Sequence, residues 1–355
     1  MKRQINEIDY SDQNIYVGFD VHLKSWKVSI MTDRMKFKPF SQDPKPETLV
    51  SYLEKNFPGG NYYSAYEAGF CGYWIHNRLL SLGVNNIVVN AADIPTTHKE
   101  KIAKEDKRDS LKIVRSLRSG ELIPIFVPSV ETMEDRSLLR ARSRFVREST
   151  RNKNRIKSYL HFNGIDLVDF DGKKHWSNNF LKWLEDIQFS QDSGKSVLAA
   201  YLDHQRYLRK TLLDLTKRVR ELSQQERYRE NARLLQTIPG VGLIVTMTFL
   251  TEIGDISRFK NVDNYCSYIG IVPSSHSSGE KDITGGLTSR TNKPLLGTIV
   301  ECSWVAIRHD AVLRSQFHKH CLRMEPNDAI IRIAKSLAKI MRSVLINKKD
   351  YVAIG

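Results

Sequence analysis

A short apolar strand that ends in a carboxylate constrains this chain more than any other feature of its sequence. Residues 15–22 read Ile-Tyr-Val-Gly-Phe-Asp-Val-His, with Asp20 near the end of the run, and this pattern is typical of a buried strand. Residues 26–31 alternate apolar and polar side chains and predict a hairpin partner with one buried face. Because burying a lone carboxylate is costly, we expect Asp20 to lie at an exposed sheet edge or beside a cation.

Strand-like and helix-like segments alternate after this hairpin and predict a mixed α/β domain. The expected strands are 35–40, 62–67 and 85–90, and the expected helices are 44–56, 71–82 and 104–117. In the second of these helices the apolar side is expected to carry Trp74, Ile75, Leu79 and Leu80. A proline-marked connector over 121–128 ends this part of the chain.

The next stretch is strongly basic. Residues 136–157 contain nine Lys or Arg and one acid, Glu148, in a chain with 55 Lys plus Arg, 40 Asp plus Glu and a net charge of +15. Helical spacing places one set of arginines on a single face, namely Arg140, Arg144, Arg147, Arg151 and Arg155. A solvated charged face is the alternative, but nearby acids do not balance this stripe. We therefore expect it to bind a nucleic-acid backbone.

A second long helix is predicted over 197–225. Residues on one side of it recur at spacings of four and three, as in an a/d coiled-coil seam: Tyr201, Gln205, Leu208, Leu212, Leu215, Val219 and Leu222. This seam suits either an antiparallel pair with the basic helix or self-association of two chains. The sequence leaves both possibilities open.

The last part of the chain begins near residue 231. Gly240 and Gly242 form a Gly-x-Gly turn before an apolar helix over 243–253, which resembles a helix-hairpin-helix element. The glycines would let backbone amides approach DNA phosphates, although a plain turn before a core helix is the alternative. A helix over 262–270 and a polar loop over 271–280 are expected next, with further helices to about residue 347.

Four acids form a candidate catalytic set: Asp20, Glu67, Asp106 and Asp109. Asp20 and Glu67 lie at the ends of predicted strands, and a spacing of three places Asp106 and Asp109 on one helix face. Clustered carboxylates repel one another unless cations intervene, and such an oxygen-rich set suits Mg²⁺ or Mn²⁺. Two such ions activate the attacking oxygen and stabilise the leaving oxygen at a phosphodiester. The alternative for the helical pair is a surface face balanced by neighbouring lysines and arginines.

Taken together, these residues resemble a known family. The four acids resemble the Asp-Glu-Asp-Asp tetrad of RuvC-like nucleases with the RNase H fold. The segments at 238–242, 259–261, 268–273 and 277–279 resemble the C-terminal domain of the one-ten family of insertion-sequence transposases, to which the Piv and MooV DNA invertases are related. The resemblance covers nearly the whole chain in the right order.

The resemblance implies a fold of class α/β plus all-α in three domains. These would be a RuvC-like catalytic domain (1–128), a basic helical coiled-coil domain (129–230) and a C-terminal helical transposase domain (231–355). It also implies cleavage and rejoining of DNA strands, Mg²⁺ or Mn²⁺ at the tetrad, a structured non-coding guide RNA, and action as a homo-oligomer, a dimer or a tetramer. The DNA partners would be the element ends and the target.

The resemblance further implies a serine nucleophile that becomes linked to a DNA 5′ phosphate. Ser278, directly before Gly279, fits best, and Ser277 is the second candidate. Glu280 and Asp282 depart from the expected basic surroundings. His276 lies two residues from Ser278 and could help, but no supporting acid has an obvious spacing and a lone loop histidine is more often incidental. A metal site from another domain would solve the activation problem. No nucleotide-binding G-x-x-x-x-G-K-[ST] loop is present, which is consistent with rejoining that needs no ATP.

Several classes are disfavoured. Four scattered cysteines, at 71, 266, 302 and 321, form no C-x-x-C pair, which argues against a structural zinc site or a disulfide framework. The first residues lack an apolar signal core and no long apolar run occurs, so we expect a cytoplasmic, nucleoid-associated protein. Three rivals remain: a Piv-like invertase that works without RNA, a metal-dependent junction-resolving nuclease, and a binding protein without catalysis.

Overall fold

The computed structural model describes residues 10–95, 106–170, 175–278, 281–288 and 291–353, and within these ranges only the backbone of 106–108, 169, 273–278 and 281–285. The chain divides into two compact units, Met1–Val127 and Pro128–Gly355. The predicted boundary between a helical middle domain and a C-terminal domain at residue 230 therefore falls inside the second unit. In the described part, none of the helices has both the length and the apolar character that crossing a membrane requires.

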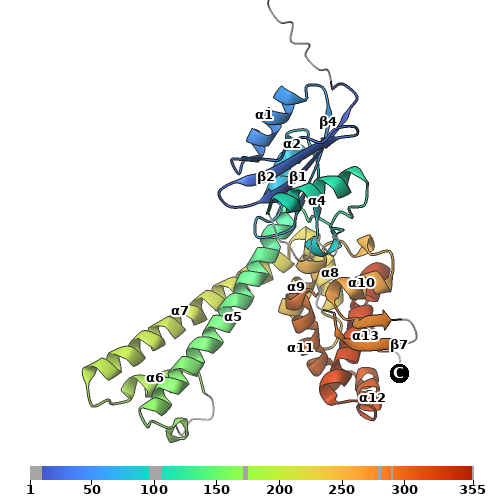
Figure 1. Ribbon diagram of the computed structural model, residues 1–355. Coiled ribbons are helices and arrows are strands. Elements are labelled where there is room, and N and C mark those ends of the chain that lie inside the picture. The colour runs from blue at the N-terminus through green and yellow to red at the C-terminus, as the bar shows by residue number, and fades with distance from the viewer. Residues whose placement is uncertain (1–9, 96–105, 171–174, 279–280, 289–290, 354–355) are drawn as a thin grey trace, which may run out of the picture. The chain divides into compact units, whose positions relative to one another are not determined.

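The first unit is built on a five-stranded sheet with the order β3-β2-β1-β4-β5 (Figure 1). Strands β1 and β2 form the predicted antiparallel hairpin, and β4 and β5 run parallel to β1. The strands are β1 (Asn14–Val21), β2 (Trp26–Thr32), β3 (Phe40–Gln42), β4 (Asn61–Glu67) and β5 (Asn85–Val89). A parallel pair needs a crossover connection, which α1 (Pro46–Asn56) and α2 (Trp74–Ser81) supply.

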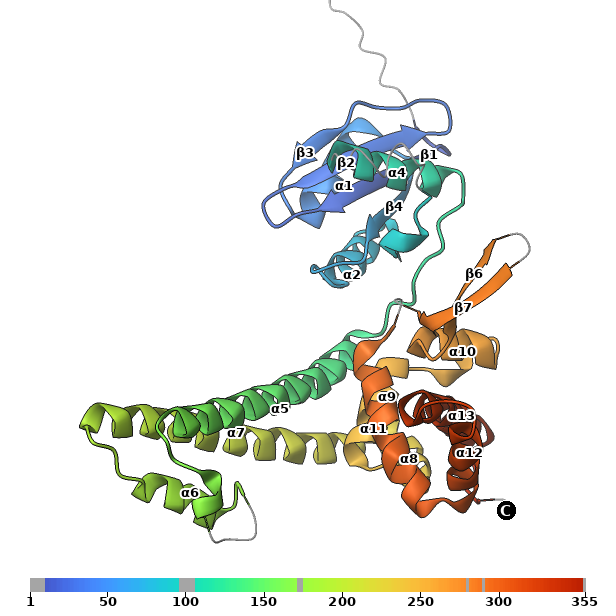
Figure 2. The ribbon, with the colours of Figure 1, turned by 60° about the horizontal axis from the view of Figure 1, so that its bottom comes forward.

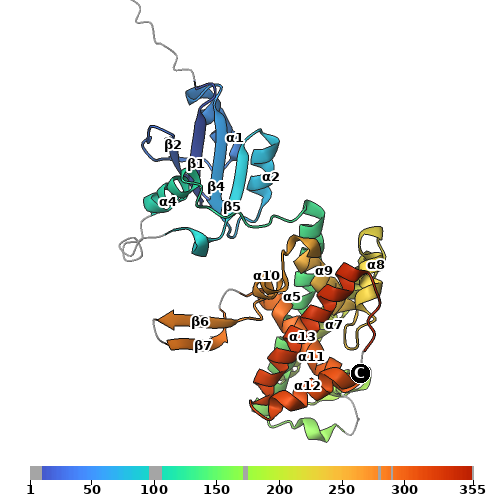
Figure 3. The same ribbon diagram turned by 90° about the vertical axis from the view of Figure 1, so that its right-hand side faces the viewer.

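Helices cover both faces of this sheet, as Figure 3 shows. Helices α1 and α2 pack over one face, where a core that includes Phe19, Trp26, Leu49 and Ile75 is buried. On the other face lies α4 (Asp106–Arg118), which packs on β1, β2 and β4. A short 3₁₀ turn, η1 (Ala91–Asp93), follows β5. The mixed α/β architecture predicted from the sequence is therefore confirmed, and it is consistent with an RNase H-like domain.

Two local predictions for this unit were wrong. The third strand lies at Phe40–Gln42 and shares only Phe40 with the expected strand at 35–40. Before Phe40 in the expected range, Lys36 makes only an isolated bridge to Met31, so no strand forms there. In α2, Ile75 and Leu79 are buried, but Trp74 and Leu80 are about half exposed. A helix of this length buries one stripe, and the side chains of Trp74 and Leu80 fall outside it.

The second unit begins with a long pair of helices, α5 (Val130–Phe162) and α7 (Asp192–Ser223) (Figure 2). Ser129 caps α5 by accepting a hydrogen bond from the Thr132 N–H. Three contacts fix the direction of the pair: Arg142 to Thr216, Asn152 to Gln205 and Tyr159 to Gly194. Residues later in α5 contact residues earlier in α7, so the two helices are antiparallel. Of the two possibilities left open for the predicted seam, the structure contains the pairing with the basic helix.

The end of this helix pair is closed by its own small core. Ile156 and Leu160 of α5 pack with Leu198 and Leu202 of α7 and with α6, and all are buried. The segment between the long helices contains η2 (Leu167–Asp169) and α6 (Asn178–Asp186). An amphipathic α6 therefore seals the apolar ends that two helices alone would leave in water.

The rest of the second unit is a helical domain with one extended hairpin. Its core joins α8, α9, α10, α11 and α13. The elements are α8 (Glu226–Leu235), α9 (Leu243–Ile253), η3 (Ile256–Arg258), α10 (Val262–Ile269), β6 (Pro273–Ser278), β7 (Lys281–Leu287), α11 (Lys293–His309), α12 (Ala311–Cys321) and α13 (Pro326–Asn347). The expected helix at 262–270 is confirmed. The expected loop at 271–280 was wrong, because residues 273–278 form a strand that pairs with β7.

Candidate active site

Asp20 and Glu67 lie at the ends of two neighbouring parallel strands. Phe19 of β1 pairs with Tyr66 of β4, so the next residues along the two strands, Asp20 and Glu67, are neighbours at the carboxyl edge of the sheet. Asp20 is partly buried and Glu67 is exposed. The sequence prediction that both acids lie at strand ends is confirmed, with Glu67 as the last residue of β4 and Asp20 as the residue before the last in β1. The register adds that these strands are adjacent.

Both acids also belong to the face of the sheet that α4 covers. In β1, Phe19 belongs to the core under α1 and α2, so the next side chain, Asp20, faces the opposite side. In β4, Ala65 belongs to the cluster that contains Ile113 of α4. Glu67 lies two residues beyond Ala65 and shares its face.

Helix α4 is held against β1 by an unusually close backbone approach. A Cβ added to Gly18 would lie 2.4 Å from the Val114 nitrogen and 2.5 Å from the Ser110 carbonyl oxygen, so only glycine fits. The buried hydroxyls of Ser29 and Ser110 lie 2.9 Å apart and tie the same turn of α4 to β2. Asp109 directly precedes Ser110, so this packing places Asp109 on the same face of the sheet as the two strand-end acids.

The contacts of the individual carboxylates are polar and local. The Asp20 Oδ2 lies 3.0 Å from the His22 Nε2, and the Asp109 Oδ1 accepts a hydrogen bond of 3.1 Å from the Lys112 Nζ. Asp106 is the first residue of α4, and its side chain lies outside the described residues. The carboxylates of Asp20 and Asp109 thus each have a nearby nitrogen group in this conformation.

The donor set suits a hard divalent cation in its chemistry. Three acids, Asp20, Glu67 and Asp109, belong to one face of the sheet, and carboxylate oxygens are the ligands that Mg²⁺ and Mn²⁺ prefer. Among the described side chains, which exclude that of Asp106, no group of three His, Cys, Asp or Glu has metal-holding geometry. The residues therefore fit such an ion by type and by face, and His22 and Lys112 would have to release carboxylate oxygens to it.

The two candidate serines lie at the tip of the β6–β7 hairpin. Ser277 pairs with Asp282 and Ser278 pairs with Lys281. Only the backbone of these residues is described, so their hydroxyl contacts lie outside the described structure. The hairpin places both serines at the far end of two paired strands, and its base continues into α11 through Asn292.

The arginine stripe on α5 is not uniform. The Arg140 guanidinium donates to both carboxylate oxygens of Glu252, with Nε–Oε1 at 2.7 Å and Nη2–Oε2 at 2.9 Å. Glu252 is 2% exposed, so this is a paired, partly structural arginine. The remaining stripe residues are exposed on α5, namely Arg144, Arg147, Arg151 and Arg155. The inference that acids do not balance the stripe was therefore wrong for Arg140, because its partner is more than 100 residues away in sequence.

The Gly-x-Gly turn has a structural explanation at its first glycine. Gly240 has φ +85°, and a Cβ there would lie 2.9 Å from the Ala306 nitrogen of α11. The Cys302 thiol donates to the Gly240 carbonyl at 3.1 Å, and burial raises the pKa of this thiol to about 12. Gly242 is exposed at the start of α9. A nucleic-acid role for the two glycines stays a prediction.

Glu252 is the most informative residue that sequence reasoning missed. Besides Arg140, the Asn292 side-chain amide donates to Glu252 Oε2 at 3.0 Å, and the Arg136 Nε lies 3.6 Å from the same oxygen. The Arg136 Nε also donates to the Thr251 carbonyl. A signal was present, because Glu252 is an acid within the otherwise uncharged stretch 243–253, and a buried acid needs a partner.

Two family models match the chain. A model for IS110-type DEDD transposases, DEDD_Tnp_IS110, described as "Transposase", matches residues 17–163. A model described as "Transposase IS116/IS110/IS902 family" matches residues 232–318. The first match begins within β1 and ends just past α5, so it contains all four candidate acids. The second contains the β6–β7 hairpin and most of the helical domain.

Individual relatives agree with these models. The chain is 29% identical over 250 residues to y4qE of Sinorhizobium fredii, a transposase by its name, and this match covers 68% of the chain and 58% of y4qE. It is 29% identical over 253 residues to the transposase for insertion sequence element IS1533 of Leptospira borgpetersenii, covering 70% and 72%. The pilin gene-inverting protein of Moraxella bovis is 26% identical over 177 residues, covering 50% and 44%.

Proposed function

Because the chain belongs to the IS110 family of transposases, we propose that it cuts and rejoins DNA at the ends of an insertion sequence and at a target. The acids on the α4 face of the sheet would form the metal-dependent site, and a serine of the β6–β7 hairpin would be the nucleophile. Since the match spans only 58% of y4qE, the activity, substrates and partners of the whole protein are proposals for this chain.

One observation carries the proposal. Asp20 and Glu67 are neighbours on one edge of the sheet, and Gly18 with the Ser29–Ser110 contact holds Asp109 on their face. A scaffold that brings like charges together in this way is costly unless a cation joins them. The close approach at Gly18 therefore supports the view that the fold brings these acids to one face, and that they are not unrelated surface acids.

The four acids would hold Mg²⁺ or Mn²⁺, with Asp106 and Asp109 supplied by the first turn of α4. When bound, such ions neutralise charge at a phosphodiester and activate the attacking oxygen. Asp20 and Glu67 would fix the cation from the sheet. His22, 3.0 Å from the Asp20 carboxylate, would orient that carboxylate or hold a proton beside it.

Ser278 is the proposed nucleophile, with Ser277 as the second candidate. The serine oxygen would form a bond to a DNA phosphorus while the bond to the neighbouring 3′ oxygen breaks, and the serine proton would pass to a base. The products are a serine–5′-phosphate link and a free 3′ hydroxyl. A 3′ hydroxyl from another strand can reverse the step, so rejoining conserves the bond energy and needs no nucleotide cofactor.

The partners proposed are DNA, a structured guide RNA and further copies of this chain. The exposed arginines of α5 would track a phosphate backbone without reading its sequence. Action as a dimer or tetramer would let the acids of one copy serve the serine of another. A nucleoid-associated place in the cytoplasm follows from these partners and belongs to the same proposal.

A Piv-like invertase is the second candidate. It is favoured by the similarity to the pilin gene-inverting protein of Moraxella bovis. This alternative keeps the metal site and the serine, and it differs in working without RNA. A junction-resolving nuclease would keep only the metal site.

A covalent trapping assay tests the proposal. The purified protein, with any RNA that co-purifies, is incubated with Mg²⁺ and labelled DNA from the element ends, and a denaturing gel reveals protein–DNA adducts. We expect an adduct that Ser278→Ala abolishes and that the neighbouring control, Ser277→Ala, retains. Cleaved DNA without an adduct in any variant would contradict the serine chemistry and favour the nuclease.

Two further arms separate the rivals. Treatment with ribonuclease before adding DNA should abolish the adduct if RNA guides the reaction, whereas an unchanged adduct favours the invertase. Asp20→Asn should abolish cleavage while leaving DNA binding intact. Cleavage at the wild-type rate in this variant would show that the strand-end acids do not form the metal site.

A further inference from the structure

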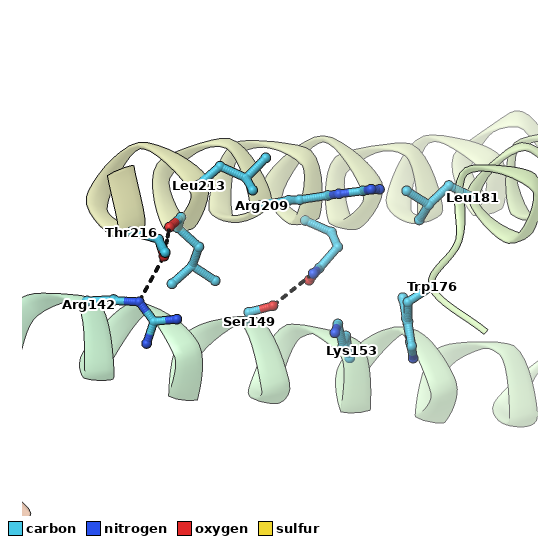
Figure 4. Close-up of a pocket in the computed structure, with 10 residues that line it drawn as sticks. Arg142, Ser149, Lys153, Trp176, Leu181, Arg209, Leu213 and Thr216 are labelled. Atoms are coloured by element: carbon cyan, nitrogen blue, oxygen red, sulfur yellow. Dashed lines mark hydrogen bonds between the residues drawn. The ribbon is translucent and has the colours of Figure 1, made fainter. Parts of the chain in front are cut away.

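A cleft of about 340 Å³ lies between α5 and α7, and its lining contains none of the candidate acids or serines. Figure 4 shows the labelled side chains that line it, with Arg142, Ser149 and Lys153 on α5 and Arg209, Leu213 and Thr216 on α7. The ten residues that line it include three cations (Arg142, Lys153 and Arg209), an indole ring (Trp176) and apolar walls (Leu212 and Leu213). No acid is among these residues.

The three cations of the cleft have neutral partners. The Arg142 Nε donates to the Thr216 hydroxyl at 2.9 Å, and the Arg209 Nη1 donates to the Asn178 side-chain oxygen at 2.8 Å. The Lys153 Nζ lies 5.4 Å from the centre of the Trp176 ring. Across the described residues, no ion pair to an acid is seen for any of the three.

This arrangement is electrostatically unfavourable without an anion. Burial lowers the pKa of Lys153, and the charges of Arg209 and Lys157 lower it further. Burial also lowers the pKa of Arg142. Arg142 and Lys153 lose hydration where they are partly buried, and Lys153 is also repelled by the neighbouring Arg209. A bound anion removes this cost, so the cleft favours a negatively charged ligand.

The length of the cleft selects among anions. Arg142 and Lys153 are about three turns apart on α5, which is roughly 16 Å at 1.5 Å per residue. A single phosphate cannot contact both ends, whereas successive phosphates of one strand can. Leu212 and Leu213 of α7 line the stretch between them, and the Leu213 side chain is 66% exposed. Apolar and aromatic surface beside cations is the composition of single-strand binding grooves.

We propose that this cleft binds a segment of single-stranded nucleic acid, with phosphates at Arg142 and at the Lys153–Arg209 end and a nucleotide against Trp176. The cleft is distinct from the exposed stripe, because Arg142, Ser149 and Lys153 lie on the face of α5 that meets α7. The inference rests on the proposed function only for the source of the strand, which is either displaced DNA or guide RNA.

Salt dependence of binding tests the inference on the full-length protein. Binding of labelled oligo(dT) and oligo(rU) of ~12 nucleotides is followed by fluorescence anisotropy. The slope of log K against log salt is negative, and each lost phosphate contact makes it shallower by about 0.7 for single strands. We expect the double variant Lys153→Met/Arg209→Gln to make this slope shallower by about 1.4. A larger effect with one oligonucleotide identifies the source as DNA or RNA.

The matched control is Lys210→Gln/Arg218→Gln. Both residues are exposed on α7, outside the cleft lining, and this double variant removes the same net charge. It should leave the slope unchanged. Equal decreases in both double variants would mean that net charge alone drives binding and would overturn the inference, as would an unchanged slope in the cleft variant. Circular-dichroism melting confirms that each variant is folded.

A second readout locates the strand. Oligonucleotide should change the tryptophan emission, and Trp176→Phe should remove that change. An undiminished change in Trp176→Phe, or the same change with inorganic phosphate or a mononucleotide at equal concentration, would overturn the inference. The trapping assay on the same proteins separates the two proposals. If the wild-type protein forms adducts but the cleft variant keeps the wild-type salt slope, only the proposed function is supported. If the wild-type protein forms no adduct but the cleft variant reduces the salt slope, only the proposed binding cleft is supported.

Discussion

At the scale of single residues, Gly18 links the packing of the first unit to its candidate site. Its missing side chain lets the backbone of α4 approach β1, where an added Cβ would lie 2.4 Å from the Val114 nitrogen. The Ser29–Ser110 contact ties the same turn of α4 to β2 and gives the helix a second point of attachment to the sheet. The glycine therefore sets where α4, and with it Asp109, lies over the sheet.

We expect Gly18→Ala to lower the free energy of unfolding by about 1–3 kcal/mol, the usual cost of forcing extra volume into a packed interior. The mutation should also reduce the rate of DNA cleavage by more than the loss of folded protein would explain, because α4 must shift away from the strand-end acids. Urea unfolding followed by circular dichroism measures the first effect, and the rate of cleavage at saturating Mg²⁺ measures the second.

The control for this prediction is Gly297→Ala. Gly297 lies in α11, with no atom within 4 Å of an added Cβ, so alanine there should be neutral or slightly stabilising. If Gly18→Ala unfolds at the wild-type urea concentration and cleaves DNA normally, the close approach does not position the site.

The residues of the site were only partly predictable. The pattern of residues 15–22 placed Asp20 at a strand end, because apolar runs and their limits are visible in sequence. That Asp20 and Glu67 are neighbours was not visible, since it depends on the parallel β1–β4 register between segments 40 residues apart. The role of Gly18 was hidden as well, because a glycine in a strand has several explanations until the approaching helix is known.

At the scale of elements, the ion-pair cluster around Glu252 joins three separate segments. Arg136 and Arg140 come from α5, Glu252 from α9, and Asn292 from the start of α11. Asn292 also caps α11 through the Leu295 N–H. The buried carboxylate thus fixes the beginning of α5 and the beginning of α11 to one point.

Breaking this cluster from the buried side should be costly. Glu252→Ala leaves Arg136 and Arg140 without their counter-charge, and loss of one partner of a buried pair costs about 3–5 kcal/mol. Arg140→Met should cost less, because Arg140 is 46% exposed and Arg136 remains to balance the acid. The measurement is chemical unfolding of the two single variants and the double variant.

The double-mutant cycle shows whether the contact between Arg140 and Glu252 contributes to the free energy of unfolding. A coupling energy of about 1 kcal/mol or more between Arg140 and Glu252 is expected for groups in direct contact. Purely additive losses would argue that Arg140 belongs to the nucleic-acid stripe alone. Arg144→Met, one turn further along α5 and exposed, is the matched control for stability and should show no coupling to Glu252.

Elements with strong periodicity were predicted well, and one element with weak periodicity was not. The seam of α7 and the basic pattern of α5 indicated two long helices, and both are present. Residues 271–280 were expected to be a loop, because the segment is rich in serine and polar residues. Strand β6 forms there because its backbone pairs with β7. Such pairing depends on the partner strand and not on local propensity.

At the scale of the whole molecule, the two compact units have separate cores, and the candidate metal ligands all belong to the first. A ligand that binds only the native state stabilises it by RT ln(1 + [L]/Kd), and it slows the local openings that disrupt its site by the corresponding factor. Mg²⁺ should therefore protect the first unit selectively. Activity measurements would not isolate this effect, because the proposed reaction uses residues of both units.

Hydrogen–deuterium exchange of the full-length protein, with and without Mg²⁺, tests this expectation directly. At about ten times the Kd, peptides from β1, β4 and α4 should exchange roughly tenfold more slowly, while peptides from α9, α11 and α13 stay unchanged. Asp20→Asn should abolish the protection, and the exposed-residue control Asp43→Asn should retain it. Protection spread evenly over both units, or retained in Asp20→Asn, would mean that the metal binds elsewhere. The strand-end acids would then need another explanation.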